Sequence, residues 1–471
     1  MIHLEAINRI HMIGIKGSGM TALAQVLQSQ GKQITGSDQE EVFFTDQILR
    51  DLNIAMVETM SPANITDDIE LVVVSAAWEQ HPETLRAKEL NIPIVNYPEM
   101  LGILSAGRPS IGVSGTHGKT TTTALLGLAA INLGLDPTVI VGSQVPQFHN
   151  TNAATGKGEY LIAETCEYRR HFLNFHPTKI IITNLEADHL DYFRDLEDII
   201  LAFQQYIDLL PAGGTIVCCI DSSAVRTLLQ KLTRTDIEII TYGVAADAQY
   251  RLVNHRVEGN KQHFQIVSNG HSEEFSMQIP GKHNCLNATA VYALCQSIIA
   301  PDHHTTAILR DTIATYQSTT RRMQYIGKRG NMLVYDDYGH HPTEIAATLR
   351  ALREFFPTHK IIASFMPHTY TRTQKLMDEF ARAFSDADEV IINEIYASAR
   401  EAPIAGISGE RLAEVTQQYH PHARYLNKID TAAYIKNIPI ADQQLFVTIG
   451  AGDNWKISQQ LSLSLGVPSL L

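Results

Sequence analysis

The sequence is poor in cysteine and has no long apolar run, and these absences exclude several classes of protein. Its five cysteines, at positions 166, 218, 219, 285 and 295, form no Cys-x-x-Cys pair, which disfavours a disulfide framework or a structural zinc site. No run approaches about 18 apolar residues, and no start segment combines basic residues, an apolar core and a cleavage site. We therefore expect a cytoplasmic protein without membrane insertion.

Basic residues are also scarce relative to acidic ones. The 37 lysines and arginines against 50 aspartates and glutamates give a net charge of −13, which opposes general nucleic-acid binding, although local basic pockets remain possible. With 471 residues, the chain is long enough for about three domains with buried cores. The expected ligands are small molecules, with no nucleic acid among them.

Residues 112–123, Gly-Val-Ser-Gly-Thr-His-Gly-Lys-Thr-Thr-Thr-Thr, are the most informative stretch. This glycine-rich turn follows the apolar run 110–113 and precedes the helix-compatible run 120–133. A strand, a tight loop and a helix in this order point backbone N–H groups at phosphate, while Lys119 reaches the outer phosphates and Thr120 holds Mg2+. The stretch predicts a site for ATP or GTP; the alternative is a polar turn that only caps a helix.

The glycine spacing of this loop departs from the strict pattern. That pattern requires glycine five residues before Gly118, where this chain has Val113. Gly112 and Gly115 flank that position. The loop is therefore a variant of the common phosphate-binding turn.

Alternating strands and helices divide the chain into three segments, 1–106, 107–321 and 322–471. This alternation favours parallel sheets with helices on both faces. We predict an α/β protein of three domains, each on a mainly parallel sheet: Rossmann-like at both ends, with a P-loop domain in the centre. The expected strands are 10–15, 33–37, 71–75, 110–113, 160–163, 179–183, 215–219, 331–335, 360–365, 389–393 and 445–449.

Two polar residues follow apolar strands of the central segment. Glu164 closes the run 160–163, and His189 comes after the run 179–183. Because parallel strands end at the same edge as the phosphate loop, both side chains are candidates to meet at a nucleotide-bound metal. A carboxylate suits Mg2+ and an imidazole is a less usual ligand. The alternative for His189 is a cap on a helix that begins near residue 190.

A glycine-rich turn in the first segment predicts a second ligand site. Residues 14–20 are Gly-Ile-Lys-Gly-Ser-Gly-Met, with the spacing G-x-x-G-x-G instead of the dinucleotide fingerprint G-x-G-x-x-G. Asp38 lies at the end of the next strand, where such folds meet a ribose. The spacing disfavours a nicotinamide cofactor. We expect a diphosphate-bearing ligand, with a turn that binds nothing as the alternative.

Further nucleotide contacts are expected from two later regions. His283, Asn284 and Asn287 precede an alanine-rich helix and have the spacing to share its first turn. They either read a nucleotide base or phosphate, or cap that helix. Arg322 and Asp337 are placed to close over ribose and phosphate from a separate domain.

Two arginines near strand ends in the third segment are candidate clamps for a substrate carboxylate. Arg372 lies in 366–373 and Arg400 in 394–401, and arginine binds carboxylates through charged hydrogen bonds. A solvated surface position is the alternative for each. His340 and His341 are adjacent in sequence, so they cannot easily point at one ion, and we discount zinc.

These motifs together resemble those of the Mur ligase family of peptidoglycan synthesis, over nearly the full chain. Residues 115–122 resemble the family's ATP loop with its displaced glycine, and 164–168 and 184–191 resemble its Mg2+-binding segments. The most specific match is 336–344, Asp-Asp-Tyr-Gly-His-His-Pro-Thr-Glu, which is typical of members that bind the muramate. The resemblance implies ATP and Mg2+ as cofactors, an acyl-phosphate intermediate, and UDP-N-acetylmuramate and L-alanine as substrates.

The resemblance also implies a role for each candidate residue. The nucleotide contacts are Gly115, Thr116, His117, Gly118, Lys119, Thr120, Thr121, His283, Asn284, Asn287, Arg322 and Asp337. The Mg2+ ligands are Thr120, Glu164 and His189. The contacts to the UDP-sugar and the amino acid are Gly17, Ser18, Gly19, Asp38, Ser75, Tyr338, His340, Arg372 and Arg400. The catalytic residues are Lys119, His189, His340 and Arg372.

One departure and several alternatives remain. Thr369 stands where the family often has an arginine that grips the amino acid, so carboxylate recognition rests on Arg372, helped by Arg400. A recycling member that joins a tripeptide to UDP-N-acetylmuramate shares two motifs, although 17–20, 368–373 and 450–453 favour alanine addition. A folylpolyglutamate synthase leaves the first domain unexplained, and the intact site residues disfavour a non-catalytic regulator. Glycine or serine stays possible as acceptor, and we expect a monomer or weak dimer.

Overall fold

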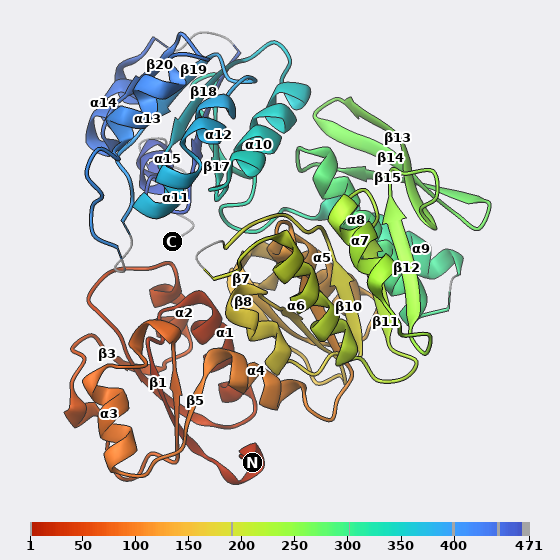
Figure 1. Cartoon of the computed structure of the whole chain (residues 1–471), viewed down its shortest axis with the longest axis vertical. Helices are drawn as coiled ribbons and strands as arrows, with labels where there is room; N and C mark the ends of the chain where they lie inside the picture. Colours follow the sequence, from red (N-terminus) through yellow and green to blue (C-terminus); the bar gives the residue numbers. More distant parts are fainter. Residues whose placement is uncertain (1, 190–191, 301, 398–400, 440–442, 464–471) are drawn as a thin grey trace. The chain divides into compact units, whose positions relative to one another are not determined.

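The computed structural model describes residues 2–189, 192–300, 302–397, 401–439 and 443–463. Three sheets with flanking helices follow one another along the chain (Figure 1). This architecture confirms the predicted α/β class with mainly parallel sheets. The chain divides into two compact units, one of Met1–Asn254, Phe264–Ser276 and Cys285–Gln317, the other of His255–His263, Met277–Asn284 and Ser318–Leu471.

The first sheet has five parallel strands in the order β3-β2-β1-β4-β5. The central strands β1 and β4 are apolar and buried, because helices cover both faces of the sheet. The predicted strand 33–37 has its expected bounds. The elements are β1 (Arg9–Ile13), α1 (Ser18–Ser29), β2 (Gln33–Ser37), α2 (Thr45–Asp51), β3 (Ala55–Val57), β4 (Leu71–Val74), α3 (Pro82–Glu89), β5 (Ile94–Asn96) and α4 (Tyr97–Ser105).

The second sheet has ten strands in the order β15-β14-β13-β12-β11-β10-β6-β9-β7-β8. Its middle strands, from β12 to β9, are parallel as predicted. The elements are β6 (Ser110–Ser114), α5 (Lys119–Asn132), β7 (Thr138–Val145), β8 (Thr151–Thr155), β9 (Leu161–Glu164), β10 (Lys179–Ile182), α6 (Leu196–Asp208), β11 (Thr215–Cys219), α7 (Ser223–Lys231), β12 (Glu238–Gly243), β13 (Tyr250–Glu258), β14 (Lys261–Ser268), β15 (His271–Met277), α8 (Lys282–Ile298) and α9 (His303–Thr315).

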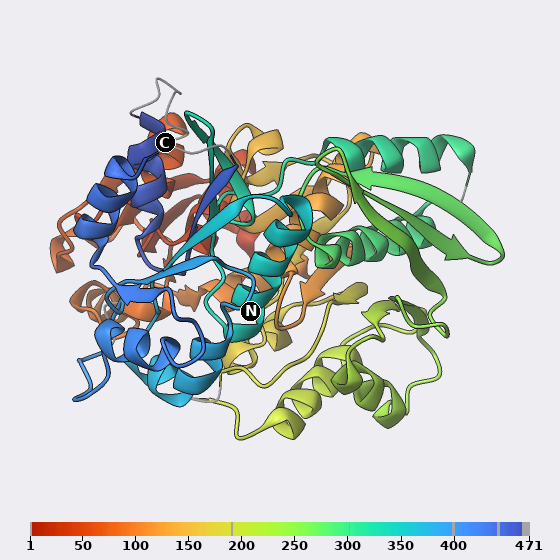
Figure 2. The same cartoon turned by 90° about the horizontal axis from the view of Figure 1, so that it is seen from above.

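The edges of this sheet were not predicted. β7 and β8 pair antiparallel at one edge, and the long strands β13 to β15 lie side by side beyond β12 (green in Figure 2). In β13 half-buried and exposed residues mostly alternate, and in β14 buried residues alternate with half-buried ones. Neither strand therefore contains the continuous apolar run that is typical of a buried parallel strand.

The first two sheets share one apolar core within the first unit. Val26 and Leu23 of α1 belong to the same buried cluster as Ile140 of β7 and Ala153 of β8. Gly102 of α4 also lies against the central sheet's connections, because a Cβ there would be 2.3 Å from the carbonyl oxygen of Asn174. Packing therefore fixes the first sheet against the second.

The third sheet has six strands in the order β16-β17-β21-β18-β19-β20. Only β16 and β17 pair antiparallel among its described strands. The strand predicted at 331–335 is wrong at its end, because β17 continues through Asp336 and Asp337, which are buried there. The elements are β16 (Gln324–Arg329), β17 (Met332–Asp337), α10 (Pro342–Phe355), β18 (Lys360–Phe365), α11 (Tyr370–Lys375), α12 (Met377–Arg382), β19 (Glu389–Ile392), α13 (Gly409–Thr416), β20 (Ala423–Tyr425), α14 (Lys428–Asn437), β21 (Gln444–Ile449) and α15 (Trp455–Leu463).

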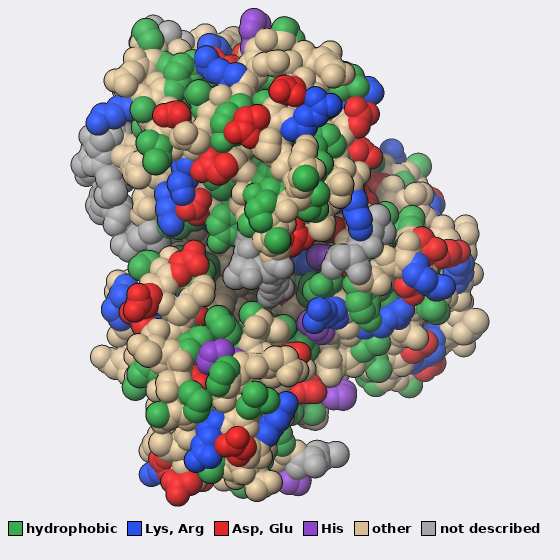
Figure 3. Space-filling view, turned by 60° about the vertical axis from the view of Figure 1, so that its left-hand side comes forward, with side chains coloured by type: hydrophobic (Ala, Val, Ile, Leu, Met, Phe, Trp, Pro, Cys, Tyr) green, Lys and Arg blue, Asp and Glu red, His purple; other side chains and the backbone are tan. Residues whose placement is uncertain are grey.

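Acidic and basic side chains lie intermixed on the face drawn in Figure 3. Exposed pairs such as Lys231 with Glu197 and Arg226 with Asp247 have short contacts of 2.6 and 2.7 Å, but pairs of this kind contribute little to stability. Within the described ranges, no helix is long and apolar enough to cross a membrane.

Candidate active site

Three strands of the second sheet end side by side at one edge. β6 pairs with β9 through Val113 and Glu164, and with β10 through Ser114 and Ile182. The segments that leave these strands therefore start close together, as expected where parallel strands end. They are the predicted phosphate loop, the segment after Glu164 and the segment that leads to His189.

Gly115 and Gly118 shape the phosphate loop. Their φ angles are 129° and 83°, which other residues rarely adopt. A Cβ at Gly115 would lie 2.2 Å from Thr183 Oγ1, and a Cβ at Gly118 would lie 2.9 Å from Asn287 Oδ1. Both positions therefore require glycine, and α5 begins directly after Gly118.

Gly112 is a glycine for a different reason. It lies in β6 and needs no unusual backbone angle, but a Cβ there would be 2.0 Å from the Tyr206 hydroxyl oxygen. That hydroxyl is buried and donates to Thr165 Oγ1 at 3.1 Å. Gly112 thus makes room for a tyrosine of α6, while Val113 is a buried core residue.

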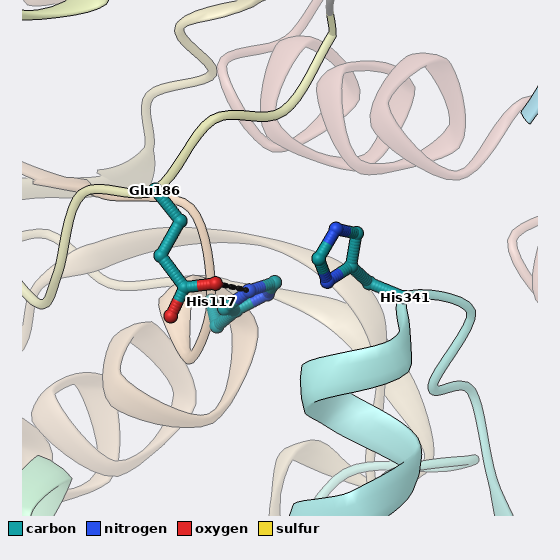
Figure 4. A group of neighbouring side chains, drawn as sticks. All are labelled: His117, Glu186 and His341. Carbon is teal, nitrogen blue, oxygen red and sulfur yellow. Dashed lines mark hydrogen bonds and ion pairs between the residues drawn. The ribbon is translucent and has the colours of Figure 1, made fainter. Parts of the chain in front are cut away.

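The segment after β10 holds the phosphate loop in place. The Thr116 N–H donates to the Asn184 carbonyl at 3.1 Å, and the His117 N–H donates to Asn184 Oδ1 at 2.9 Å. The Glu186 N–H donates to Thr116 Oγ1 at 2.9 Å, and Glu186 also faces the His117 ring, with Oε2 3.4 Å from Nε2 (Figure 4). These contacts fix the loop from the side opposite α5.

Lys119 is held at the base of the loop. Its ammonium group donates to the carbonyls of Gly115 and Thr116 and lies 3.2 Å from Glu167 Oε2. Burial alone would lower the pKa of Lys119, but the nearby acidic groups, Glu167 foremost, together outweigh it and raise the pKa above its ordinary value. The lysine is therefore a fixed positive charge beside the loop.

Thr120 and Glu164 meet as expected for two ligands of one metal. Thr120 Oγ1 donates to Glu164 Oε2 at 3.1 Å, and the Gly142 N–H of β7 donates to Glu164 Oε1 at 2.5 Å. A hydroxyl and a carboxylate are oxygen donors of the kind that Mg2+ prefers. Thr121, next along α5, is buried, and its carbonyl accepts the Tyr316 hydroxyl at 3.3 Å.

His189 lies in a local turn with a left-handed backbone, at φ 53°. Its N–H donates to Asp188 Oδ1 at 2.7 Å, and its ring centre is 4.7 Å from that of Tyr168. The next described helix, α6, begins at Leu196 and is capped by Asp195. The helix start expected near residue 190 lies outside the described residues.

The candidates around the start of α8 have different surroundings. Asn287 lies against Gly118 of the phosphate loop. Asn284 bonds within its own turn, since its side chain donates to the Pro280 carbonyl at 2.7 Å and its N–H donates to the Gly281 carbonyl at 2.9 Å. His283 packs on Gly281, where a Cβ would be 2.4 Å from its Cε1.

The first glycine turn leads into α1, with Gly17 as N-cap and Ser18 as the first helical residue. Gly19 is fixed as glycine by packing, because a Cβ there would lie 2.6 Å from the ring of Tyr97 at the start of α4. Ser75 follows β4, and its N–H donates to the Ile13 carbonyl at 3.0 Å.

Asp38 is buried and bonded to the turn itself. It accepts the N–H of Lys16 at 2.7 Å and that of Gln39 at 2.8 Å. Burial raises its pKa, although these bonds and the Lys16 charge oppose the rise. The position at the end of β2 is as predicted, but the contacts show that Asp38 also stabilises the glycine turn.

In the second unit, Asp337 is a backbone anchor at the end of β17. It accepts the N–H groups of Met323 and Gly339 at 2.8 and 2.9 Å and the Thr348 hydroxyl at 3.1 Å. Arg322 lies nearby, with its guanidinium carbon 5.0 Å from the centre of the Tyr338 ring. The two predicted nucleotide contacts thus flank the turn after β17.

Tyr338 and His340 pack against each other, with ring centres 5.4 Å apart. His340 Nδ1 lies 3.2 Å from the Tyr338 carbonyl oxygen, which can only accept, so Nδ1 carries the proton in this contact. His341 stands at the start of α10 (Figure 4), where its Nδ1 accepts the Thr343 N–H at 3.4 Å. His341 therefore caps α10 through this ring nitrogen.

Arg372 lies in the short helix α11, which follows β18. Thr369, which precedes the helix, has φ 69° and ψ 142°, a strained backbone for a β-branched residue. Arg400 lies outside the described residues. Glu401 accepts the N–H groups of Tyr370 and Thr371 at 2.7 and 3.2 Å.

Sequence reasoning missed several residues of this site. Glu167 and Glu186 lie inside the segments 164–168 and 184–191 that the motifs had singled out, so proximity along the chain was the available signal. Tyr97 and Gly142 had no such signal, because they come from α4 and β7 and reach the site only through packing.

Three domain models of one family match the chain: the Mur ligase family catalytic domain at 9–109, the Mur ligase middle domain at 113–295 and the Mur ligase glutamate ligase domain at 321–452. Relatives named UDP-N-acetylmuramate–L-alanine ligase come from Treponema pallidum, 42% identical over 463 residues and 96% of each chain, and from Desulfitobacterium hafniense, 43% identical over 455 residues, 96% of this chain and 99% of the relative.

Solved structures show the same architecture. A UDP-N-acetylmuramate–alanine ligase from Thermotoga maritima superposes with a TM-score of 0.82 at 28% identity, covering 97% of this chain and 99% of that one. A murein peptide ligase from Psychrobacter arcticus shares the fold, with a TM-score of 0.71 at 22% identity over 98% of this chain and 99% of that one. From the three domain models and the near full-length relatives, the chain belongs to the Mur ligase family.

Proposed function

We propose that the chain is an ATP-dependent ligase that joins L-alanine to the lactyl carboxylate of UDP-N-acetylmuramate in peptidoglycan precursor synthesis. The observation that carries the proposal is the edge of the second sheet, where Lys119 and the Thr120–Glu164 pair lie around a loop shaped for phosphate. The relatives with 42% and 43% identity, which carry the name of this activity, support the choice of substrates.

The chemistry explains why such a site is needed. A carboxylate is a poor electrophile, so the terminal phosphoryl group of ATP is first transferred to a lactyl carboxylate oxygen, which gives an acyl phosphate and ADP. The alanine amine then attacks the acyl carbon, the C–O bond to phosphate breaks, and the amine loses a proton. Phosphoryl transfer of this kind depends on positioning and on neutralised charge, and water must be excluded from the intermediate.

We assign the ATP phosphates to residues 115–121, with Lys119 as the positive charge and Asn287 at the border of the loop. His283, Asn284, Arg322 and Asp337 remain proposed contacts to the rest of the nucleotide. The local bonds of Asn284 and Asp337 support a role in shaping their turns as well.

The proposed Mg2+ ligands are Thr120, Glu164 and His189. The oxygen donors of Thr120 and Glu164 fit Mg2+, because they lie 3.1 Å apart at the end of the phosphate loop. When bound there, Mg2+ would neutralise charge on the outer phosphates of ATP.

For the remaining substrates we propose two sets of contacts. Gly17, Ser18, Gly19, Asp38 and Ser75 would hold the UDP-sugar. Tyr338, His340, Arg372 and Arg400 would hold the amino acid and the reacting carboxylate. With Nδ1 of His340 bonded to the Tyr338 carbonyl, Nε2 is the atom that would accept a proton from the amine.

Other features of the chain are proposed with the function. We keep domain boundaries at 106/107 and 321/322, a cytoplasmic location and a monomer or weak dimer. The alternative activity is that of the recycling ligase, which accepts a tripeptide. The murein peptide ligase from Psychrobacter arcticus shares the fold of this chain.

The test is phosphate release from ATP and Mg2+ with UDP-N-acetylmuramate, comparing L-alanine, glycine, L-serine and the tripeptide as acceptors. We expect turnover with L-alanine and its loss in Lys119→Ala, while Lys157→Ala, which removes an exposed lysine of the same domain, keeps wild-type turnover. Turnover with the tripeptide alone would identify the recycling ligase, and no turnover with any acceptor would reject the proposed activity.

A further inference from the structure

Asn152 of β8 connects the first glycine turn to the central sheet. Its side chain is fully buried, at 0% exposure. Nδ2 donates to the carbonyl of Ser18 at 2.6 Å, and Oδ1 accepts from Gln25 Nε2 at 2.6 Å. Ser18 and Gln25 both lie on α1. One amide from the second sheet is therefore hydrogen-bonded to the first turns of this helix.

The surroundings of this contact are apolar. Ala153 and Ile140 of the second sheet share a buried cluster with Met20 and Leu23 of α1. An apolar contact tolerates small sliding movements, but a buried amide that loses its hydrogen-bond partners is strongly unfavourable. Asn152 therefore allows only the register in which both of its bonds are made.

The same two strands lead to the proposed metal site. β8 pairs with β7 through Ala153 and Ile140, and the N–H of Gly142 in β7 donates to Glu164. The Asn152–Ser18 bond, the pairing of β8 with β7 and the Gly142–Glu164 bond thus link the Ser18 carbonyl, through two paired strands, to the carboxylate beside Thr120.

The start of α1 has a second contact inside the first unit. The ring of Tyr97 lies over Gly19, within 2.6 Å of where a Cβ would stand. Tyr97 begins α4. Asn152 of β8 and Tyr97 of α4 therefore both contact the first turn of α1.

We propose that Asn152 is a positioning residue that holds the start of α1, and with it the UDP-sugar diphosphate, in register with the phosphate-transferring edge of the second sheet. This inference rests on the proposed function. The lactyl carboxylate and the terminal phosphate must meet in line, and a misplacement of about 1 Å costs about 100-fold in rate. Asn152 acts through Ser18 and contacts no reacting atom.

The test compares Asn152→Asp with Asn150→Asp. The first change keeps the side-chain shape and the bond from Gln25 but sets a carboxylate oxygen against the Ser18 carbonyl. The second makes the same chemical change at an exposed position just before β8. For Asn152→Asp we expect kcat/KM for UDP-N-acetylmuramate to fall by about tenfold or more, with the KM for ATP within about twofold of wild type. Asn150→Asp should match wild type.

Gln25→Met provides a second variant if Asn152→Asp does not fold. It removes one of the two bonds of Asn152 and keeps the side-chain volume, so kcat/KM for the UDP-sugar should fall by about threefold. Unchanged kinetics in a folded variant would overturn the inference. A KM that rises by the same factor for all three substrates, together with a lower Tm, would also overturn it, because that result indicates a structural role alone. If the wild type does not use UDP-N-acetylmuramate, the proposed function fails and the inference with it.

Discussion

The Lys119 ammonium lies 3.2 Å from the Glu167 carboxylate, at the base of the phosphate loop. Glu167 is 3% exposed, so the pair is largely removed from water. A buried lysine needs such a partner, because an unpaired buried charge is strongly unfavourable. Glu167 therefore keeps the loop lysine charged before any phosphate arrives.

The first prediction concerns this pair and pH. The raised pKa of Lys119 means that its contribution to stability is complete below the unfolded value of 10.5 and disappears as the pH rises through the higher folded value. Glu167→Gln should therefore lower stability by about 1–3 kcal/mol at neutral pH. The difference from wild type should shrink above pH 10.5, measured by thermal unfolding across that range.

The matched control is Glu186→Gln, which makes the same change on the other side of the loop, where the side chain is 38% exposed. It should change stability little at any of these pH values. A Glu167→Gln protein as stable as wild type at neutral pH would contradict the role assigned to the pair.

The second prediction concerns the metal ligands. Thr120→Val keeps the shape of the side chain and removes the hydroxyl that bonds Glu164. The Mg2+ concentration for half-maximal activity should rise by about tenfold or more. Thr120→Ser retains the hydroxyl and should stay near wild type. Equal Mg2+ requirements in the two variants would remove Thr120 from the ligand set.

The third prediction concerns Gly112 of β6. Gly112→Ala places a Cβ 2.0 Å from the Tyr206 oxygen, and overpacking of this kind costs about 1–3 kcal/mol. Tyr206→Phe removes that oxygen, so the double variant should lose less stability than the two single losses added together. Urea unfolding of the four proteins measures this coupling, and simple additivity would show that the hydroxyl is not the obstacle.

The fourth prediction concerns the buried carboxylate of β17. Asp336 is 2% exposed at its side chain, lies 3.1 Å from Arg321 and accepts the Thr448 hydroxyl at 2.6 Å. Arg321→Ala leaves this charge without its cation and should destabilise the protein by about 3–5 kcal/mol. Adding Asp336→Asn removes the charge and should recover part of the loss in urea unfolding. A double variant that is no more stable than Arg321→Ala would contradict this account.

Local patterns were sufficient for the buried parallel strands. Strands 33–37, 215–219 and 360–365 have their predicted bounds. In 215–219 and 360–365 the pattern is a nearly continuous apolar run, which is typical of a strand covered on both faces. The same rule failed at the end of β17, where two aspartates continue the strand. β17 extends through Asp336 and Asp337 because other residues, among them Arg321 and Thr448, form hydrogen bonds with these carboxylates. Those residues are distant in sequence.

In the candidate site, too, some features follow from the sequence and others only from the tertiary structure. The sequence determined that a phosphate loop follows β6 and that Glu164 ends a neighbouring strand, because backbone conformation and parallel pairing follow from local residue patterns. Only the tertiary structure decided three contacts. Gly112 leaves room for the Tyr206 hydroxyl, Glu167 forms an ion pair with Lys119, and the Asn152 side chain donates to the Ser18 carbonyl. These relationships depend on which helix packs on which strand, and packing is set by side chains that meet across the fold rather than by neighbours along the chain.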